Sequence, residues 1–186
     1  MKKLTRECWV NAGFKILDTE GHTRFSSENI ARLLNVTRGS FYHHFKNRKD
    51  FVRTLLYRWE LEYTELMLVQ ANMGHTLDDV LKRYLDVASQ KHPLREIAIC
   101  AWALSDSLVA EYQHRVDEKR LSFVINKLNQ LSIPLEYAEK IGKLIHLCLI
   151  GGQMSGDRHN AQEFNQLILN TLSLKKFYFA FKPAYF

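Results

Sequence analysis

Side chains that donate hydrogen bonds or carry positive charge gather between residues 25 and 51, in the stretch FSSENIARLLNVTRGSFYHHFKNRKDF. Hydroxyl, phenol, imidazole and guanidinium groups donate hydrogen bonds to phosphate oxygens, and a guanidinium can also pair with the edge of a guanine base. Positive charge is concentrated in the same part of the chain, because residues 1–50 hold ten Lys and Arg against five Asp and Glu, whereas residues 51–186 hold 16 against 15. Such a local excess favours a polyanionic partner, since each cation near a phosphate releases condensed counterions.

Two short helices joined by a tight turn are predicted to present these side chains. The first begins at Ser26 or Ser27, either of which can cap it. Its inward-facing positions are Ile30, Ala31 and Leu34. The turn, Asn35-Val36-Thr37, contains an asparagine, which tolerates the left-handed conformation that a helix-to-helix corner needs. Thr37 is expected to cap a second helix, from Arg38 to about Phe45.

The second helix is predicted to be amphipathic, with Phe41 and Phe45 on its inward side because they lie four residues apart. The outward-facing residues are Arg38, Gly39, Ser40, Tyr42, His43 and His44. Two helices of this size form a helix-turn-helix, whose second helix fits the major groove of DNA. Gly39 costs about 1 kcal/mol of helix propensity relative to alanine. Either a close approach to DNA or simple tolerance explains it.

At these residues the sequence resembles the N-terminal domain of the TetR family of bacterial transcriptional regulators. The family pattern is met by Ser26, Ile30-Ala31, Asn35-Val36-Thr37, Tyr42-His43-His44-Phe45, Arg48 and Phe51. The family's first helix is matched by Arg6, Trp9, Val10, Ala12, Phe14, Leu17 and Gly21. Two departures are Asn35, where the family commonly has glycine, and Arg48, which replaces the usual lysine and keeps its charge. The resemblance covers residues 5–60.

The resemblance implies two groups of contacts with double-stranded DNA. Phosphate contacts are expected from Ser26, Ser27, Tyr42, His44, Arg48 and Lys49. Base reading is expected from Thr37, Arg38, Gly39, Ser40 and His43. Arg38 is the strongest candidate for reading a base, because bidentate pairing with guanine discriminates by roughly 1 to 3 kcal/mol. A phosphate contact or a solvated side chain is the alternative for this residue.

The rest of the chain is predicted to be helical. Gly and Pro are sparse, at 8 and 3 residues, and apolar residues recur at spacings of three and four. The predicted fold is all-α with about nine helices. A helix from Arg48 to about Met73, on the order of 37 Å long, joins a three-helix helix-turn-helix head to a larger body. We expect a DNA-binding domain at residues 1–47 and a helical domain for effector binding and dimerisation at residues 48–186.

The segment from Pro134 to Gly156 is apolar on two sides and is therefore expected to be buried on both. One side carries Ala138, Ile141, Gly142, Ile145, Cys148, Leu149 and Gly152, and the other carries Tyr137, Leu144, Leu147 and Gly151. We expect the side with Gly142 and Gly152 to meet a second copy of the chain. With the following helix, the predicted dimer interface comprises Ile141, Gly142, Ile145, Leu149, Gly152, Phe164, Leu167, Ile168 and Leu172. A helix buried within a monomer is the alternative.

Aromatic residues in the middle of the chain could line a pocket for a small apolar or amphipathic effector. The candidates are Tyr84, Cys100, Trp102, Tyr112 and Phe123. An ordinary hydrophobic core explains the same residues equally well.

Other classes of site and of protein are disfavoured. His43 and His44 diverge by about 100° on a helix, which argues against a shared metal ion. Cys8, Cys100 and Cys148 lie far apart and are expected to be free, buried thiols. HExxH, Walker and GxSxG motifs are missing, so we expect no enzyme and no cofactor.

Membrane insertion and secretion are also disfavoured. The longest uncharged stretch, Leu144–Gly156, has 13 residues, fewer than the roughly 18 that a membrane span needs. The segment MKKLTRECW lacks the apolar core of a signal peptide, which predicts a cytoplasmic protein.

Together, these features predict a dimeric, sequence-specific transcriptional regulator that acts as a ligand-responsive repressor on a pseudo-palindromic operator. An architectural or nucleoid-associated DNA-binding protein on the same fold, without an effector, is the alternative.

Overall fold

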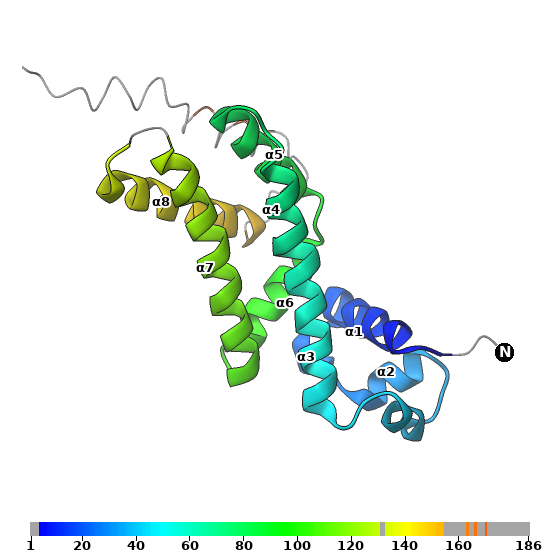
Figure 1. The fold of residues 1–186 in the computed structure, drawn as a ribbon. Helices are drawn as coiled ribbons and strands as arrows, with labels where there is room; N and C mark the ends of the chain where they lie inside the picture. The colour runs from blue at the N-terminus through cyan, green and yellow to red at the C-terminus, as the bar shows by residue number, and fades with distance from the viewer. Residues whose placement is uncertain (1–3, 131–132, 155–162, 164–165, 167–169, 171–186) are drawn as a thin grey trace, which may run out of the picture. The chain divides into compact units, whose positions relative to one another are not determined.

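The computed structural model describes residues 4–130 and 133–154, together with the single positions Glu163, Gln166 and Asn170. Within these residues the chain is helical without strands, which confirms the predicted all-α class. The α-helices are α1 (Arg6–Glu20), α2 (Ser27–Leu33), α3 (Arg48–Glu60), α4 (Leu66–Ala71), α5 (Leu77–Ser89), α6 (Pro93–Ala103), α7 (Ser107–Asn129) and α8 (Leu135–Met154) (Figure 1). Two 3₁₀ helices, η1 (His22–Arg24) and η2 (Arg38–His43), and a π-helical turn, η3 (Leu61–Glu65), complete the described part.

The long helix predicted from Arg48 to about Met73 is present but has an internal change of winding. Helix α3 passes into η3 at Leu61 and then into α4, which ends at Ala71. A π-helical turn adds a residue to one turn and rotates the faces that follow it. The apolar positions of α3 and α4 therefore do not form one straight stripe.

Side chains cap the starts of α2 and α3. Ser26 accepts a hydrogen bond from the backbone N–H of Asn29, at 3.1 Å, so it is Ser26 rather than Ser27 that caps α2. Asn47 caps α3 by accepting from the N–H of Asp50, at 2.9 Å. These bonds satisfy backbone donors that a helix leaves unpaired at its first turn.

The described chain divides into two compact units. The first comprises the residues up to Glu65 together with His92–Lys119, and the second comprises Leu66–Lys91 together with the described residues from Arg120 on. The first unit thus contains the predicted head and also α3, α6 and most of α7. The functional division into residues 1–47 and 48–186 stays a prediction.

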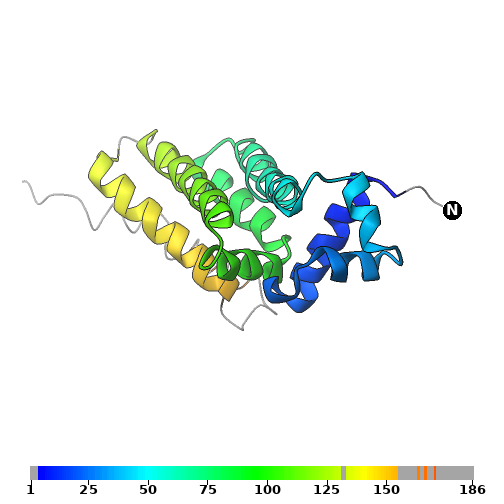
Figure 2. The ribbon, with the colours of Figure 1, turned by 90° about the horizontal axis from the view of Figure 1, so that it is seen from below.

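Within the first unit, α1 and α2 lie side by side, in blue in Figure 2, and α1 also packs against α6. Arg95 of α6 ties these two helices together by donating two hydrogen bonds to Asp18 of α1, at 2.6 and 2.9 Å. Its guanidinium also lies over the ring of Phe14, 4.0 Å from the ring centre. Both charged side chains are largely buried, so this joint holds α1 against α6 in a region from which water is mostly excluded.

A second charged joint connects the end of α3 to α7. The carboxylate of Glu60 is buried and accepts hydrogen bonds from Arg115, at 2.8 and 2.5 Å, and from Lys119, at 2.9 Å. The hydrogen bonds from Arg115 hold the pKa of Glu60 below its ordinary value. Lys119 also binds Glu65 in η3. Charge pairs therefore fix the π-helical turn against α7.

The three cysteines are free, as expected, but each is partly exposed rather than buried. The prediction of buried thiols is wrong, because all three side chains are half-buried; Cys148 packs against the core of the second unit. Cys100 donates a hydrogen bond to Gln113, at 3.6 Å.

Candidate nucleic-acid interface

The segment predicted as the second helix of the helix-turn-helix starts at Arg38 but is wound as the 3₁₀ helix η2 and ends at His43. Short 3₁₀ stretches are common where α-helix propensity is low, and Gly39 lowers it here. The predicted cap at Thr37 is wrong, because the Thr37 side chain makes no bond to the backbone of η2. Its Oγ1 lies 3.4 Å from Oγ of Ser40 instead.

The turn before η2 has the predicted backbone. Asn35 has a φ of 55°, in the left-handed region that asparagine tolerates better than most residues. The N–H of Val36 bonds to the carbonyl of Ala31, at 3.0 Å, which closes the end of α2. The chain can therefore reverse between α2 and η2 within three residues.

An aromatic cluster beneath η2 fixes the orientation of this segment. Phe41 and Phe45 are both buried, with Phe41 only 1% exposed, which confirms that they point inward. The Phe41 ring packs on Trp9 of α1 and on Phe51 of α3, with ring centres 5.5 Å apart in each pair. Phe51 in turn stacks on Phe25. Edge and offset contacts of this kind restrain ring orientation as well as burying apolar area.

With the aromatic side held inside, the predicted DNA-contacting side chains occupy the outside of the same unit. The exposed ones are Thr37, Arg38, Gly39, Tyr42, His43, Arg48 and Lys49, and the half-buried ones are Ser26, Ser27, Ser40 and His44. They come from the start of α2, the turn, η2 and the start of α3. The described structure thus collects all the predicted donors on one unit, and their individual roles stay predictions.

Nothing inside the described part of the chain requires glycine at position 39. A Cβ atom built there would meet Oγ1 of Thr37 at 3.6 Å, an ordinary contact distance. The sequence leaves two explanations for Gly39, close approach of DNA and simple tolerance of glycine. This geometry is compatible with both.

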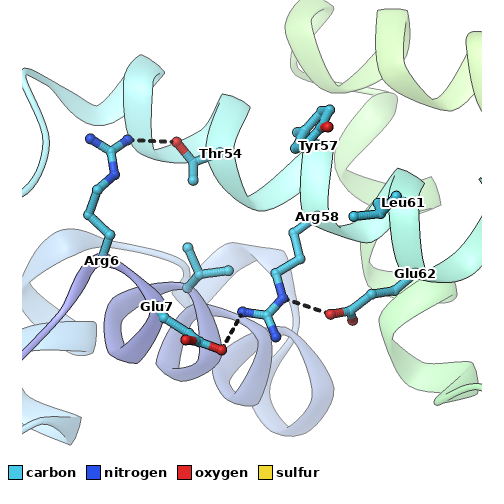
Figure 3. A pocket seen from close by; sticks show the side chains of 8 residues that line it. Arg6, Glu7, Thr54, Tyr57, Arg58, Leu61 and Glu62 are labelled. Atoms are coloured by element: carbon cyan, nitrogen blue, oxygen red, sulfur yellow. Dashed lines mark hydrogen bonds and ion pairs between the residues drawn. The ribbon is translucent and has the colours of Figure 1, made fainter.

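Arg6, to which the sequence analysis assigns no role, holds the end of the η2 segment in place. Its Nη1 donates to the backbone carbonyl of His44, at 2.9 Å, and its Nη2 donates to Oγ1 of Thr54, at 3.0 Å (Figure 3). The guanidinium also lies over the ring of Phe45 and forms an ion pair with Asp50. Arg6 therefore links α1 to both the end of η2 and the first turns of α3. A cation in the first turn of a helix, where the dipole disfavours it, is the sequence signal for such a role.

Arg6 and Thr54 also line a shallow groove between α1 and α3 with a volume of about 350 Å³, shown in Figure 3. Arg58 crosses it and bridges Glu7 of α1, at 3.2 Å, and Glu62 of η3, at 2.7 Å. The hydrogen bond to Glu62 raises the pKa of Arg58 above its ordinary value. The ion pair between Arg58 and Glu7 therefore connects α3 to α1 at a second point, in addition to the hydrogen bond from Arg6 to Thr54.

The residues predicted to line an effector pocket are divided between the two units. Cys100, Trp102 and Tyr112 belong to the first unit, and Tyr84 and Phe123 belong to the second. Trp102 is buried against Phe25, with ring centres 4.7 Å apart, and so is part of the core beneath the head. Tyr84 and Phe123 stack on each other at 6.1 Å. The effector pocket stays a prediction.

Of the residues predicted at a dimer interface, those on α8 can be located in the structure. Ile145 and Leu149 are buried within the second unit, and a Cβ on Gly142 would lie 2.8 Å from Cγ1 of Ile125 in α7. This side of α8, which also includes half-buried Ile141, therefore faces its own chain, where the sequence led us to expect a second copy. Gly152 is half-buried on α8. Phe164, Leu167, Ile168 and Leu172 lie outside the described residues.

The opposite side of α8 is exposed in the single chain. Its apolar residues are Tyr137, Leu144 and Leu147. A Cβ on Gly151 would have no neighbour within 4 Å. The helix is therefore apolar on two sides, as predicted, but the side that Gly142 occupies is the one covered by its own chain.

The described residues contain neither a membrane-spanning helix nor a metal-binding cluster. No described helix is long and apolar enough to cross a membrane. No group of three His, Cys, Asp or Glu side chains within the described ranges is arranged to hold a metal ion.

Comparison with known proteins assigns the head. Residues 10–55 match the family described as "Bacterial regulatory proteins, tetR family". The chain carries a TetR-family DNA-binding domain. The match includes Phe25, Phe41, Phe45 and Phe51 of the aromatic cluster, the turn at Asn35 and η2, so the exposed donors lie on the part of the molecule that the family shares.

Two curated proteins are similar to longer stretches of the chain than this match. The chain is 27% identical over 119 residues to the Transposon Tn10 TetC protein of Escherichia coli, a match that covers 59% of this chain and 60% of TetC. It is 28% identical over 64 residues to the transcriptional regulator AcuR of Cereibacter sphaeroides, covering 34% of this chain and 29% of AcuR. The chain thus spans less than two thirds of either curated relative.

The fold is shared over a longer range. The crystal structure of a transcriptional regulator from Rhodococcus sp. Rha1 superposes with a TM-score of 0.70 and 16% identity, covering 90% of this chain and 97% of the other. At this identity the likeness concerns the fold alone. The chain therefore shares its all-helical fold with this regulator.

Proposed function

We propose that this TetR-family protein is a ligand-responsive transcriptional repressor that binds a pseudo-palindromic operator as a dimer. The observation that carries the proposal is the set of exposed donors on η2 and the adjoining helix starts, held outward by buried Phe41 and Phe45. A rigid aromatic support of this kind suits a surface that must match the width of a DNA groove. No catalytic role is proposed, and the expected location is the cytoplasm.

The donors divide into two proposed roles. Arg38 lies at the start of η2 and is exposed, and we assign it to base reading in the major groove. Arg48 and Lys49 begin α3, where the helix dipole adds to their attraction for a phosphate, and we assign them to the backbone of DNA. Ser26, Ser27, Tyr42 and His44 are assigned to phosphates, and Thr37, Gly39, Ser40 and His43 to bases.

Dimerisation is proposed to use the exposed side of α8. Leu144 and Leu147 lie on it one turn apart, and Gly151 continues the same side with no neighbour within 4 Å of a built Cβ. An apolar side of a helix is costly to leave in water and permits close approach of a partner helix where glycine is present. We propose that two copies pack through this side, so that the two heads reach successive major grooves.

Selection of bound fragments from random DNA at a stated salt concentration tests the proposal. A regulator is expected to prefer its best site over random duplex by about 10³ or more. An architectural protein on the same fold would show little preference, and a chain that bound no duplex at all would contradict both functions.

Two substitutions then separate the assigned roles. Arg38→Ala is expected to relax preference at one base step in each half-site, whereas Arg48→Ala is expected to weaken all sequences alike and to flatten the salt dependence of binding. A change of sequence preference in Arg48→Ala would contradict the division of roles. Candidate effectors are tested by whether they alter affinity for the selected operator, as a two-state coupling requires.

A further inference from the structure

Arg48 has an acidic neighbour that does not belong to the head. Its Nη1 lies 3.6 Å from Oδ2 of Asp106, in the corner between α6 and α7. The guanidinium carbon also lies 5.5 Å from the centre of the Trp102 ring at the end of α6. The Arg48 side chain is 56% exposed, so it is held at the corner loosely and can swing toward solvent. Within the described residues no ion pair involves Arg38 or Lys49, the other cations assigned to DNA.

Asp106, by contrast, is fixed in place. Its Oδ1 accepts hydrogen bonds from the N–H groups of Leu108, at 3.1 Å, and Val109, at 3.4 Å, so it caps the first turn of α7. Its own N–H bonds to the carbonyl of Trp102, at 3.1 Å. The side chain is 23% exposed. One oxygen is thus committed to the helix and the other is left to face Arg48.

We propose that Asp106 is an affinity-determining residue that competes with DNA phosphate for Arg48. The proposal rests on the proposed DNA-binding function. An arginine engaged by a carboxylate at 3.6 Å gains less from a phosphate than a free one, and the same carboxylate repels a phosphate brought near it. Both effects lower affinity for every DNA sequence alike.

The test is Asp106→Asn, measured against the operator selected above by titration at fixed salt. The amide oxygen of asparagine still caps α7, so only the charge is removed. Operator and random duplex are both expected to bind about two- to fivefold more tightly, the range given by an exposed ion pair. Asp106→Ser, which also keeps a capping oxygen, is expected to give the same gain and serves if the asparagine variant folds poorly.

Glu28→Gln is the matched control, because Glu28 is an exposed acid of α2 that pairs with Arg32 at 3.6 Å, and its loss changes the net charge equally. Its gain in affinity is expected to be smaller than that of Asp106→Asn. In an Arg48→Ala background the gain from Asp106→Asn is expected to be smaller than in the unaltered chain, since the competed side chain is gone and only the direct repulsion of phosphate remains to be relieved.

Three results would overturn the inference while leaving DNA binding intact. Asp106→Asn could bind more weakly, it could gain no more than Glu28→Gln, or its gain could be just as large in the Arg48→Ala background. If the unaltered chain bound no duplex, the proposed function itself would fail, and the inference with it.

Discussion

The head segment around η2 and helix α8 are both amphipathic, but only the first has a single apolar side. In the head segment from Arg38 to Phe45 the two phenylalanines point inward and the other side chains are polar or small, so inside and outside follow from spacing alone. In α8 apolar residues cover two sides, and one of them packs on Ile125 while the other stays exposed. The difference shows that periodicity identifies a side of a helix but does not identify what covers it.

The largest effect on stability is expected from removing a buried ring of the head segment, which has a single apolar side. Phe41→Ala deletes a ring that contacts Trp9, Phe45 and Phe51, and is expected to cost about 3 to 5 kcal/mol in the free energy of unfolding. Urea unfolding monitored by circular dichroism measures it. Tyr42→Ala, at a neighbouring position that is 57% exposed, is the control and is expected to stay within about 0.5 kcal/mol. Equal losses in the two variants would contradict the inward orientation of Phe41.

An intermediate effect is expected from the exposed side of α8. Leu147→Asp places a charge on a residue that is 55% exposed in the single chain, so the fold is expected to survive. Self-association is expected to weaken by about 2 kcal/mol or more, as at the centre of an interface. Sedimentation equilibrium measures the dissociation constant.

The matched change is Glu139→Ala, at an exposed position on a polar part of the same helix, which is expected to leave association unchanged. If Leu147→Asp associated as tightly as the unaltered chain, the proposal that dimers form through the exposed side of α8 would be wrong.

The smallest effect on stability is expected at Gly39. A methyl group fits there within the chain, because the nearest atom is 3.6 Å from the built Cβ, so Gly39→Ala is expected to change the free energy of unfolding by less than about 0.5 kcal/mol. Affinity for the operator is expected to fall if Gly39 is in the proposed base-reading set, because the added methyl group would then separate η2 from DNA. Unchanged operator binding would favour simple tolerance of glycine and would separate this residue from the DNA-reading set.

Much of the head could be predicted because its signals are local. The cap at Ser26, the left-handed Asn35 and the burial of Phe41 each depend on residues within one or two helical turns. The 3₁₀ winding of η2 was not predictable from spacing. Over a segment this short, 3₁₀ and α-helical turns place Phe41 on nearly the same side, and the packing of the buried phenylalanines decides between them. Arg6 was missed for a different reason: its partners, His44 and Thr54, lie 38 and 48 residues away.

The sequence by itself determined the helical class, the position of the DNA-binding segment and the set of donors on its outer side, since these follow from composition, spacing and short-range capping. Only the tertiary structure decided that Trp102 supports the head, that Asp106 faces Arg48 and that Gly142 packs on its own chain. The physical reason is that each of these depends on which distant element covers a given side chain. Spacing along one helix carries no information about that choice.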